Sequence, residues 1–166
     1  RSLRIISRVG VGTDSIDLVS AHSCGIHVAT TPNSPVKAVA EHTLALLLST
    51  LKHIPQYNEQ MRKNNSTLST GTLLYGKTAG IVGMGRVGSR VAEMLECLGC
   101  RICFFDPWFS RDQPATWKRF DSLEDMTSNV DILSLHSAPL PEGKPLITKS
   151  VLSHAKGLTI INTARG

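Results

Sequence analysis

The sequence Lys77-Thr-Ala-Gly-Ile-Val-Gly-Met-Gly-Arg-Val-Gly88 decides the fold of this chain. It opens with a short apolar run and closes with Gly83, Gly85 and Gly88 in G-x-G-x-x-G spacing. The residues that follow, 89–98, carry apolar side chains at helical spacing. The pattern predicts a buried strand, a glycine turn and a helix, which is the context in which this motif binds a pyrophosphate.

Each glycine of the motif has its own expected role. Gly83 permits the tight turn, Gly85 lets the backbone approach a phosphate, and Gly88 lets the helix pack on the strand. The anion would then lie on the free N–H groups at the positive end of the helix dipole.

Strands and helices alternate on both sides of the motif, which predicts a parallel sheet with right-handed crossovers. Upstream we expect a short helix capped by Asp14 between two strands, and a Ser/Thr/Asn/Gly linker over 64–72. The expected strands are 3–9, 26–29, 78–82, 101–105, 131–135 and 158–161, and the expected later helices are 86–98, one near Leu123 and one near Ser150.

The helix expected from Val36 to Ile54 is apolar around most of its axis. A helix that is apolar nearly all round is buried nearly all round. In a chain of 166 residues this predicts a second body against the helix, either another domain or another subunit.

Composition narrows the function classes. The formal net charge of +5 comes from scattered Lys and Arg with few aromatic residues, so we expect no nucleic-acid partner. No apolar run approaches the length of a membrane span or forms a signal peptide, so we expect a cytoplasmic protein without a membrane partner. Cys97, Cys100 and Cys103 have C-x2-C-x2-C spacing, but they fall on a helix end, a turn and a strand, so we expect no metal site.

Three polar residues follow expected strands, where ligands of such sheets gather. Asp106 lies 23 residues after Gly83, the place of an acid that binds adenosine ribose hydroxyls; alternatively it only begins a turn with Pro107. An acid there favours NAD over NADP, although Arg111 leaves NADP open. His136 is either a hydrogen-bonded structural imidazole or an acid or base, and Arg165 is either a carboxylate ligand or a surface ion-pair partner.

Five ordered blocks of this sequence resemble the D-isomer-specific 2-hydroxyacid dehydrogenase family, and the first is most similar to its phosphoglycerate dehydrogenase branch. The blocks are Arg8-Val-Gly-Val-Gly-Thr-Asp-Ser-Ile-Asp17, Val39-Ala-Glu-His-Thr-Leu-Ala-Leu-Leu-Leu48, Gly76-Lys-Thr-Ala-Gly-Ile-Val-Gly-Met-Gly-Arg-Val-Gly88, Asp131-Ile-Leu-Ser-Leu-His136 and Asn162-Thr-Ala-Arg-Gly166. The resemblance implies an NAD-dependent oxidoreductase that moves a hydride between nicotinamide and a D-2-hydroxy acid or 2-oxo acid.

The resemblance also assigns cofactor contacts. Together with Gly83, Gly85, Gly88 and Asp106, which the motif had already indicated, it implies that Arg86 and Val87 meet the pyrophosphate through their backbone. Thr163 and Ala164, with Arg165, would meet the nicotinamide end, and Ser137 would lie near the cofactor.

For the substrate, the resemblance implies that the backbone N–H groups of Gly10, Val11 and Gly12 receive the carboxylate and that Arg165 is the catalytic arginine. The family's acid/base histidine and its glutamate partner lie downstream of that arginine. The chain stops at Gly166, so we expect neither, and we expect this chain alone to bind NAD at best.

The implied architecture is a Rossmann-type doubly wound parallel α/β sheet, incomplete at its C-terminal end, with a remnant of a flavodoxin-like substrate domain. We expect the substrate-domain remnant at 1–35, interdomain helices and linker at 36–75, and the dinucleotide-binding domain at 76–166. The Val36–Ile54 helix would pack a homodimer. The alternative is a corepressor-like module that senses NAD(H) and has no catalytic role.

Overall fold

The computed structural model describes residues 2–65, 70–138, 140 and 144–165. It divides into two compact units, Arg1–Ala38 and Val39–Gly166. In the part of the chain that the structure describes, no helix is both long and apolar enough to cross a membrane.

The first unit is a strand, helix, strand segment. It consists of β1 (Ile5–Arg8), α1 (Leu18–Ser23) and β2 (His27–Thr30). The two strands pair in parallel, with Ile5 opposite His27. Their apolar side chains are largely exposed within the unit, because one short helix cannot cover both faces of a two-stranded sheet.

The expectation that Asp14 caps α1 was wrong. A turn closed by the Ile16 N–H and the Thr13 carbonyl oxygen, 2.8 Å apart, delays the start of the helix. Asp17 is the N-cap instead, and its Oδ1 accepts a 2.9 Å hydrogen bond from the Ser20 N–H. A hydrogen bond from the Ser20 hydroxyl to the other carboxylate oxygen, and after it this backbone bond, lower the pKa of Asp17, because both favour the carboxylate.

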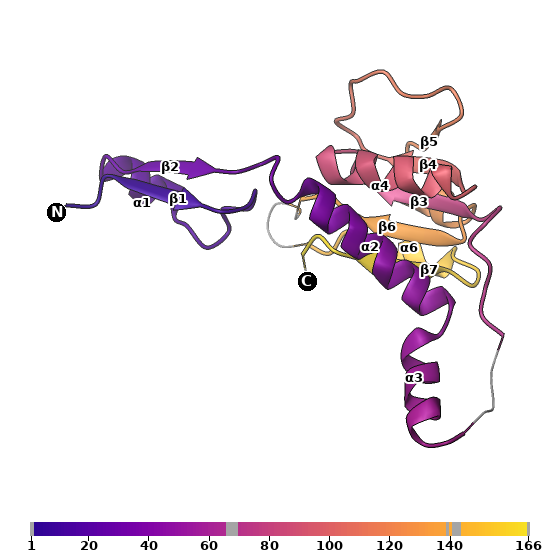
Figure 1. Cartoon of the computed structure of the whole chain (residues 1–166). Coiled ribbons are helices and arrows are strands. Elements are labelled where there is room, and N and C mark those ends of the chain that lie inside the picture. The colour runs from indigo at the N-terminus through magenta and orange to yellow at the C-terminus, as the bar shows by residue number, and fades with distance from the viewer. Residues whose placement is uncertain (1, 66–69, 139, 141–143, 166) are drawn as a thin grey trace. The chain divides into compact units, whose positions relative to one another are not determined.

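The second unit holds a parallel sheet that, within the described residues, has five strands in the order β5-β4-β3-β6-β7 (Figure 1). The strands are β3 (Thr78–Val82), β4 (Arg101–Phe105), β5 (Lys118–Arg119), β6 (Ile132–Leu135) and β7 (Thr159–Asn162). The chain leaves the central β3 toward β4 and β5, then returns to build β6 and β7 on the other side. This reversal is the doubly wound Rossmann order that the sequence predicted. The two-residue strand β5 was not predicted.

Helices cover both faces of this sheet. The helices that pack on it are α2 (Val36–Leu51), which begins before the unit boundary, α4 (Arg86–Cys97), α5 (Leu123–Thr127) and α6 (Lys149–Ser153). Helix α3 (Ile54–Arg62) has no buried residue and extends away from the sheet (Figure 1). On one face, Ile81 and Phe104 of the sheet pack with apolar residues of α2 and α4. On the other face, Val82 and Leu133 pack with residues of α5 and α6.

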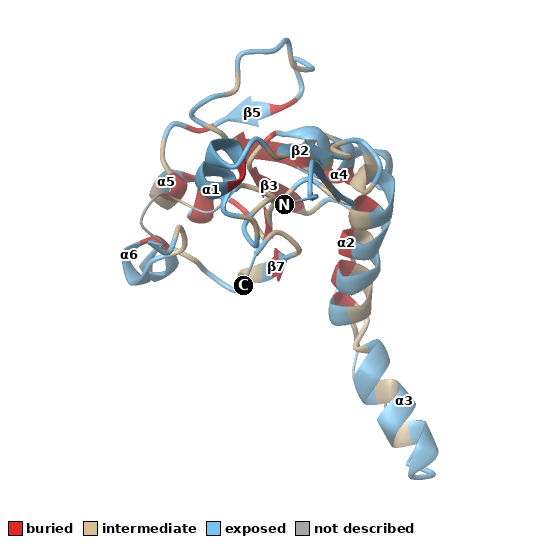
Figure 2. Ribbon diagram, turned by 90° about the vertical axis from the view of Figure 1, so that its left-hand side faces the viewer, coloured by how far each residue is buried: buried red, intermediate tan, exposed pale blue. Residues whose placement is uncertain are grey.

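Helix α2 ends at Leu51, earlier than expected, because His53 takes the left-handed conformation (φ 54°) before α3 begins. Within this chain α2 buries one stripe, formed by Ala40, Thr43, Leu47 and Leu51 (Figure 2). Its other side keeps apolar residues such as Leu46 at the surface. The predicted second body against α2 stays a prediction.

The glycine turn allows a test of the fold. A β-carbon on Gly88 would overlap the carbonyl oxygen of Gly83, whereas one on Gly85 would meet no atom within 4 Å. We therefore expect Gly88→Ala to lower the free energy of unfolding by about 2–3 kcal/mol, since a backbone atom cannot step aside as a flexible side chain can. Gly85→Ala is the matched control and should lower it by no more than about 1 kcal/mol, because Gly85 is the N-cap of α4, where alanine is less favourable than glycine. Urea denaturation followed by circular dichroism measures both, and equal effects would contradict this packing.

Candidate functional site

Four strands of the second unit end at the same level. Val82 of β3 stands opposite Phe105 of β4 and Leu135 of β6, and Leu135 stands opposite Asn162 of β7. The residues that follow these strands therefore emerge side by side at the carboxyl edge of the sheet. The chain reverses direction between β3 and β6, and ligands of open α/β sheets bind in the crevice at such a reversal.

The glycine turn lies at this crevice. Gly83 has φ 88°, which favours glycine, and a β-carbon there would lie 2.7 Å from the backbone nitrogen of Ser137. The close approach places Ser137, which follows β6, against the turn. Gly85 is exposed and has open space where a side chain would stand. The turn thus leaves room for a group that contacts backbone.

Helix α4 starts directly from this turn. Gly85 is its N-cap, and no side chain caps the helix. Arg86 and Val87 are its first residues, so the N–H groups of the first turn are left for another acceptor. Together with the open space at Gly85, this end of α4 suits an anion such as a pyrophosphate.

Asp106 follows β4 and is fastened to the glycine turn. Its Oδ2 accepts a 2.8 Å hydrogen bond from the Met84 N–H, and its Oδ1 accepts a 2.9 Å bond from the Trp108 N–H. A carboxylate has about four lone-pair positions, so acceptor capacity remains for ribose hydroxyl groups. Asp106 therefore does begin a local turn, and it also lies at the edge where an adenosine ribose would bind.

Two arginines donate to backbone groups at this end of the crevice, and neither contact was predicted from the sequence. Arg111 Nη2 donates to the Met84 carbonyl oxygen at 3.0 Å. Arg119 donates to the carbonyl oxygens of Asp106 and Phe109, at 3.1 and 3.2 Å. The sequence had indicated Arg111 only through its nearness to Asp106 in the chain. Arg119 had no signal, because it lies in the unpredicted strand β5.

His136 follows β6, and its ring is held by a buried neighbour. Its Nε2 lies 2.8 Å from Oγ of Ser134, which is 1% exposed. Burial lowers the pKa of His136 to about 4, because desolvation disfavours the imidazolium. The imidazole is therefore neutral near pH 7.

The segment after β7 forms a tight turn at the same edge. The Asn162 side chain closes it, accepting from the Ala164 N–H at 3.0 Å and donating to the Arg165 carbonyl oxygen at 2.6 Å. The Thr163 hydroxyl oxygen lies 2.8 Å from that of Thr43 on α2. Arg165 is exposed, and its Nη1 donates to the Ala164 carbonyl oxygen at 2.8 Å.

The loop of Gly10, Val11 and Gly12 belongs to the first unit. Gly10 has φ 123°, and its N–H donates to the Thr31 hydroxyl at 2.8 Å. That bond uses one of the three N–H groups that the resemblance assigns to a carboxylate. Val11 is exposed and Gly12 is partly exposed.

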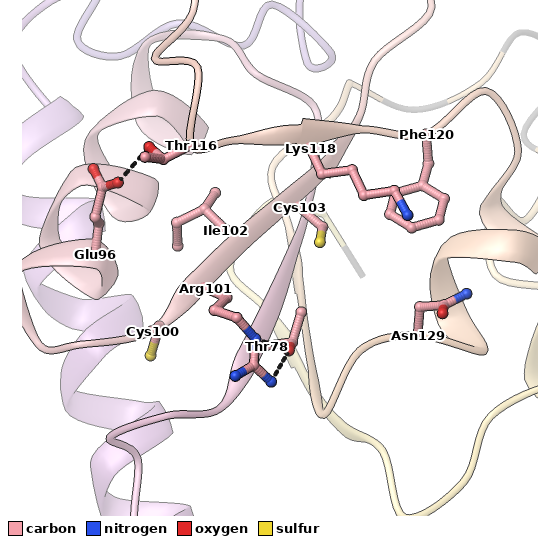
Figure 3. A pocket seen from close by; sticks show the side chains of 10 residues that line it. All are labelled: Thr78, Glu96, Cys100, Arg101, Ile102, Cys103, Thr116, Lys118, Phe120 and Asn129. Atoms are coloured by element: carbon pink, nitrogen blue, oxygen red, sulfur yellow. Dashed lines mark hydrogen bonds between the residues drawn. The ribbon is translucent and has the colours of Figure 1, made fainter.

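A cavity of about 590 Å³ lies at the opposite, amino edge of the sheet (Figure 3). Two of its charged side chains bond to threonines: Arg101 donates to the Thr78 hydroxyl at 2.9 Å, and Glu96 accepts from the Thr116 hydroxyl at 2.9 Å. The third, Lys118, has its Nζ 4.5 Å from the centre of the Phe120 ring. Cys100 and Cys103 also line it as free thiols, and burial raises the pKa of both. The exposed Cys97 is free too, and in the described residues no group of three ligands is arranged for a metal ion.

The fold and the carboxyl-edge site together define a dinucleotide-binding α/β protein. Two family models match the chain: the NAD binding domain of D-isomer specific 2-hydroxyacid dehydrogenase over residues 44–166, and the catalytic domain of the same family over residues 1–83. The chain belongs to this family, as the sequence predicted, and the family's cofactor is NAD.

Individual proteins show the same relationship. The chain is 37% identical to a D-3-phosphoglycerate dehydrogenase of Bacillus subtilis, over 99% of this chain and 32% of that protein. It is also 37% identical to a glyoxylate reductase of Aeropyrum pernix, over 99% of this chain and 52% of the other. A D-lactate dehydrogenase from Aquifex aeolicus, solved with NAD and lactic acid, matches with a TM-score of 0.87 and 31% identity over 99% of this chain and 50% of that one. The chain thus spans about a third of the length of its phosphoglycerate dehydrogenase relative.

The buried imidazole of His136 predicts a pH effect on stability. Its pKa is about 4 in the folded protein and about 6.5 in an unfolded chain, so the unfolded state binds more protons between these values. We expect the free energy of unfolding to fall as the pH drops from about 6.5 to about 4, by at most about 1.4 kcal/mol per pH unit from this group. His136→Gln should remove that part of the slope. Urea titrations at several pH values measure the slopes, and an unchanged slope in His136→Gln would contradict a buried neutral imidazole.

Proposed function

We propose that the protein carrying this chain is an NAD-dependent D-2-hydroxyacid dehydrogenase, similar to phosphoglycerate dehydrogenase, and that the second unit binds the cofactor. The observation that carries the proposal is the open backbone cradle at Gly85, between the uncapped start of α4 and the Asp106 carboxylate. None of the similarities found supports the alternative of a corepressor-like module.

The carboxyl edge divides into two ends in this proposal. At one end the N–H groups of Arg86 and Val87 bind the pyrophosphate beside Gly83, Gly85 and Gly88, and Asp106 accepts from the adenosine ribose. The remaining carboxylate lone pairs and the free first turn of α4 support this assignment. At the other end Ser137, Thr163 and Ala164 surround the nicotinamide, which is supported by the alignment of the β6 and β7 ends.

NAD, when bound, supplies the nicotinamide carbon that exchanges a hydride with the C2 atom of a 2-hydroxy or 2-oxo acid. Arg165 orients the acid: its planar guanidinium binds the carboxylate through paired N–H groups and stabilises negative charge on the 2-oxo oxygen. In the first unit, the N–H groups of Val11 and Gly12 are donors that the proposal assigns to a substrate carboxylate. His136 has no acid/base role in this proposal, since its Nε2 faces Ser134 and its pKa is low.

The same proposal covers the organisation of the protein. Residues 1–35 are part of the substrate domain, residues 36–75 form the interdomain helices and linker, and residues 76–166 form the dinucleotide-binding domain. Helix α2 packs a homodimer, which would cover the apolar residues that it leaves exposed in this chain, among them Leu46.

Cofactor binding is tested by removing the Asp106 carboxylate. We expect Asp106→Ala to raise the Kd for NADH about 10- to 100-fold, because hydrogen bonds to a charged group contribute about 1.5–3 kcal/mol. Asp112→Ala removes an exposed carboxylate nearby and should leave the Kd within about twofold. Isothermal titration calorimetry measures both. NADPH is titrated in parallel. If the wild type binds NADPH more tightly than NADH, Asp106 is not the ribose ligand.

The catalytic assignment is tested at Arg165. Arg165→Lys keeps the charge but loses the planar pair of donors, so we expect kcat/KM for reduction of a 2-oxo acid to fall about 100-fold or more. The Kd for NADH should change less than about threefold. Steady-state assays of the whole protein with phosphohydroxypyruvate and glyoxylate give the first quantity. A variant as active as the wild type would remove Arg165 from the mechanism.

A further inference from the structure

The hydroxyl groups of Thr43 and Thr163 join helix α2 to the end of β7, although they are 120 positions apart in the chain. Their oxygen atoms are 2.8 Å apart. Thr43 is 1% exposed and stands in the buried stripe of α2, whereas Thr163 is partly exposed at the carboxyl edge. Thr43 is thus buried in the core, whereas Thr163 lies at the border of the crevice.

The position of the shared proton follows from counting donors. A hydroxyl group has one proton and two lone pairs. Thr43 Oγ1 also lies 2.8 Å from the carbonyl oxygen of Val39, which can only accept, so Thr43 donates its proton there. Thr163 must then donate to Thr43. The O–H of Thr163 points toward Thr43, and its two lone pairs are what it can offer to the crevice.

We infer that Thr43 is a positioning residue for the cofactor: it holds the Thr163 hydroxyl as a pure acceptor for the carboxamide N–H of the nicotinamide. The inference rests on the proposed function, which places Thr163 at the nicotinamide end. A carboxamide presents N–H donors that must find acceptors when water is excluded. Thr43 itself does not touch the cofactor and acts only through Thr163.

The hydrogen bond between Thr43 and Thr163 could instead serve only to hold α2 against the sheet. Two substitutions at Thr43 distinguish this structural role from the positioning role. Thr43→Val removes the hydroxyl with little change in volume, which frees the Thr163 proton to rotate. Thr43→Ser keeps the hydroxyl and loses a methyl group, so it is the matched control. A purely structural role would lower stability without changing which part of the cofactor is recognised.

The first measurement compares NADH with ADP-ribose, which lacks the nicotinamide ring, by calorimetry on the full chain. In Thr43→Val we expect the Kd for NADH to rise about five- to tenfold, as for the loss of one hydrogen bond, and the Kd for ADP-ribose to stay within about twofold. Thr43→Ser should bind both like the wild type.

The second measurement compares NAD with its analogue that carries a nicotinic acid in place of the nicotinamide. The carboxylate of this analogue offers no N–H and only accepts, so it meets a Thr163 that also only accepts. We expect the wild type to prefer NAD over the acid analogue, and we expect this ratio of Kd values to narrow about fivefold in Thr43→Val, where Thr163 can turn and donate.

Each outcome decides one claim. If the wild type binds neither NADH nor ADP-ribose, the cofactor proposal fails and this inference fails with it. The inference is wrong, while the cofactor proposal stands, if the wild type binds both ligands and Thr43→Val binds NADH as tightly as the wild type does. It is also wrong if Thr43→Val raises the Kd values for NADH and ADP-ribose by the same factor, or if it keeps the full preference of the wild type for NAD over the acid analogue.

Discussion

The contact between Gly88 and the carbonyl oxygen of Gly83 is the constraint on which the second unit depends. It allows the first turn of α4 to lie directly against the end of β3, closer than any side chain would permit. Because the helix starts this close to the sheet, the uncapped N–H groups of its first turn lie at the carboxyl edge. The same turn leaves no room for a side chain at Gly83, where the backbone of Ser137 approaches from β6. The glycine spacing thus fixes both the packing of α4 and the floor of the crevice.

The level of the strand ends depends on a second contact at the far end of the sheet. Asp131 precedes β6, and its Oδ2 accepts a 2.8 Å hydrogen bond from the Thr78 N–H at the start of β3. Lys77 Nζ lies 3.1 Å from the other carboxylate oxygen. The Thr78 bond first, and then Lys77, lower the pKa of Asp131, so the carboxylate stays charged near neutral pH. With β3 and β6 in register from this end, His136 and Ser137 emerge beside Gly83.

The sequence was sufficient for features that local chemistry determines. The glycine spacing, the apolar runs and Asp106 after a strand predicted the sheet and its ligand edge, because each depends on residues close together in the chain. Prediction failed where a feature depends on local backbone geometry or on residues far apart in the chain. Strand β5 has only two residues and no apolar signal, so Arg119 was missed. Asp17 rather than Asp14 caps α1, because a turn intervenes. No local pattern relates Thr43 to Thr163, although a threonine within an apolar helical run was a hint that it needs a polar partner.

Asp106 links the choice of cofactor to the shape of the turn. Its carboxylate accepts from Met84 within the glycine turn and from Trp108 after β4, so two backbone segments depend on a doubly accepting side chain. A neutral amide in its place has a single acceptor oxygen and could satisfy only part of this pair. In the proposed function the negative charge of Asp106 opposes a 2'-phosphate, so a substitution that admits NADP would also loosen the glycine turn at which we propose the pyrophosphate binds. Arg111 donates to the Met84 carbonyl oxygen and could offset the charge of the 2'-phosphate, but it offers no acceptor to replace the lost carboxylate oxygen. The proposed ribose recognition and the geometry of the turn therefore depend on the same side chain.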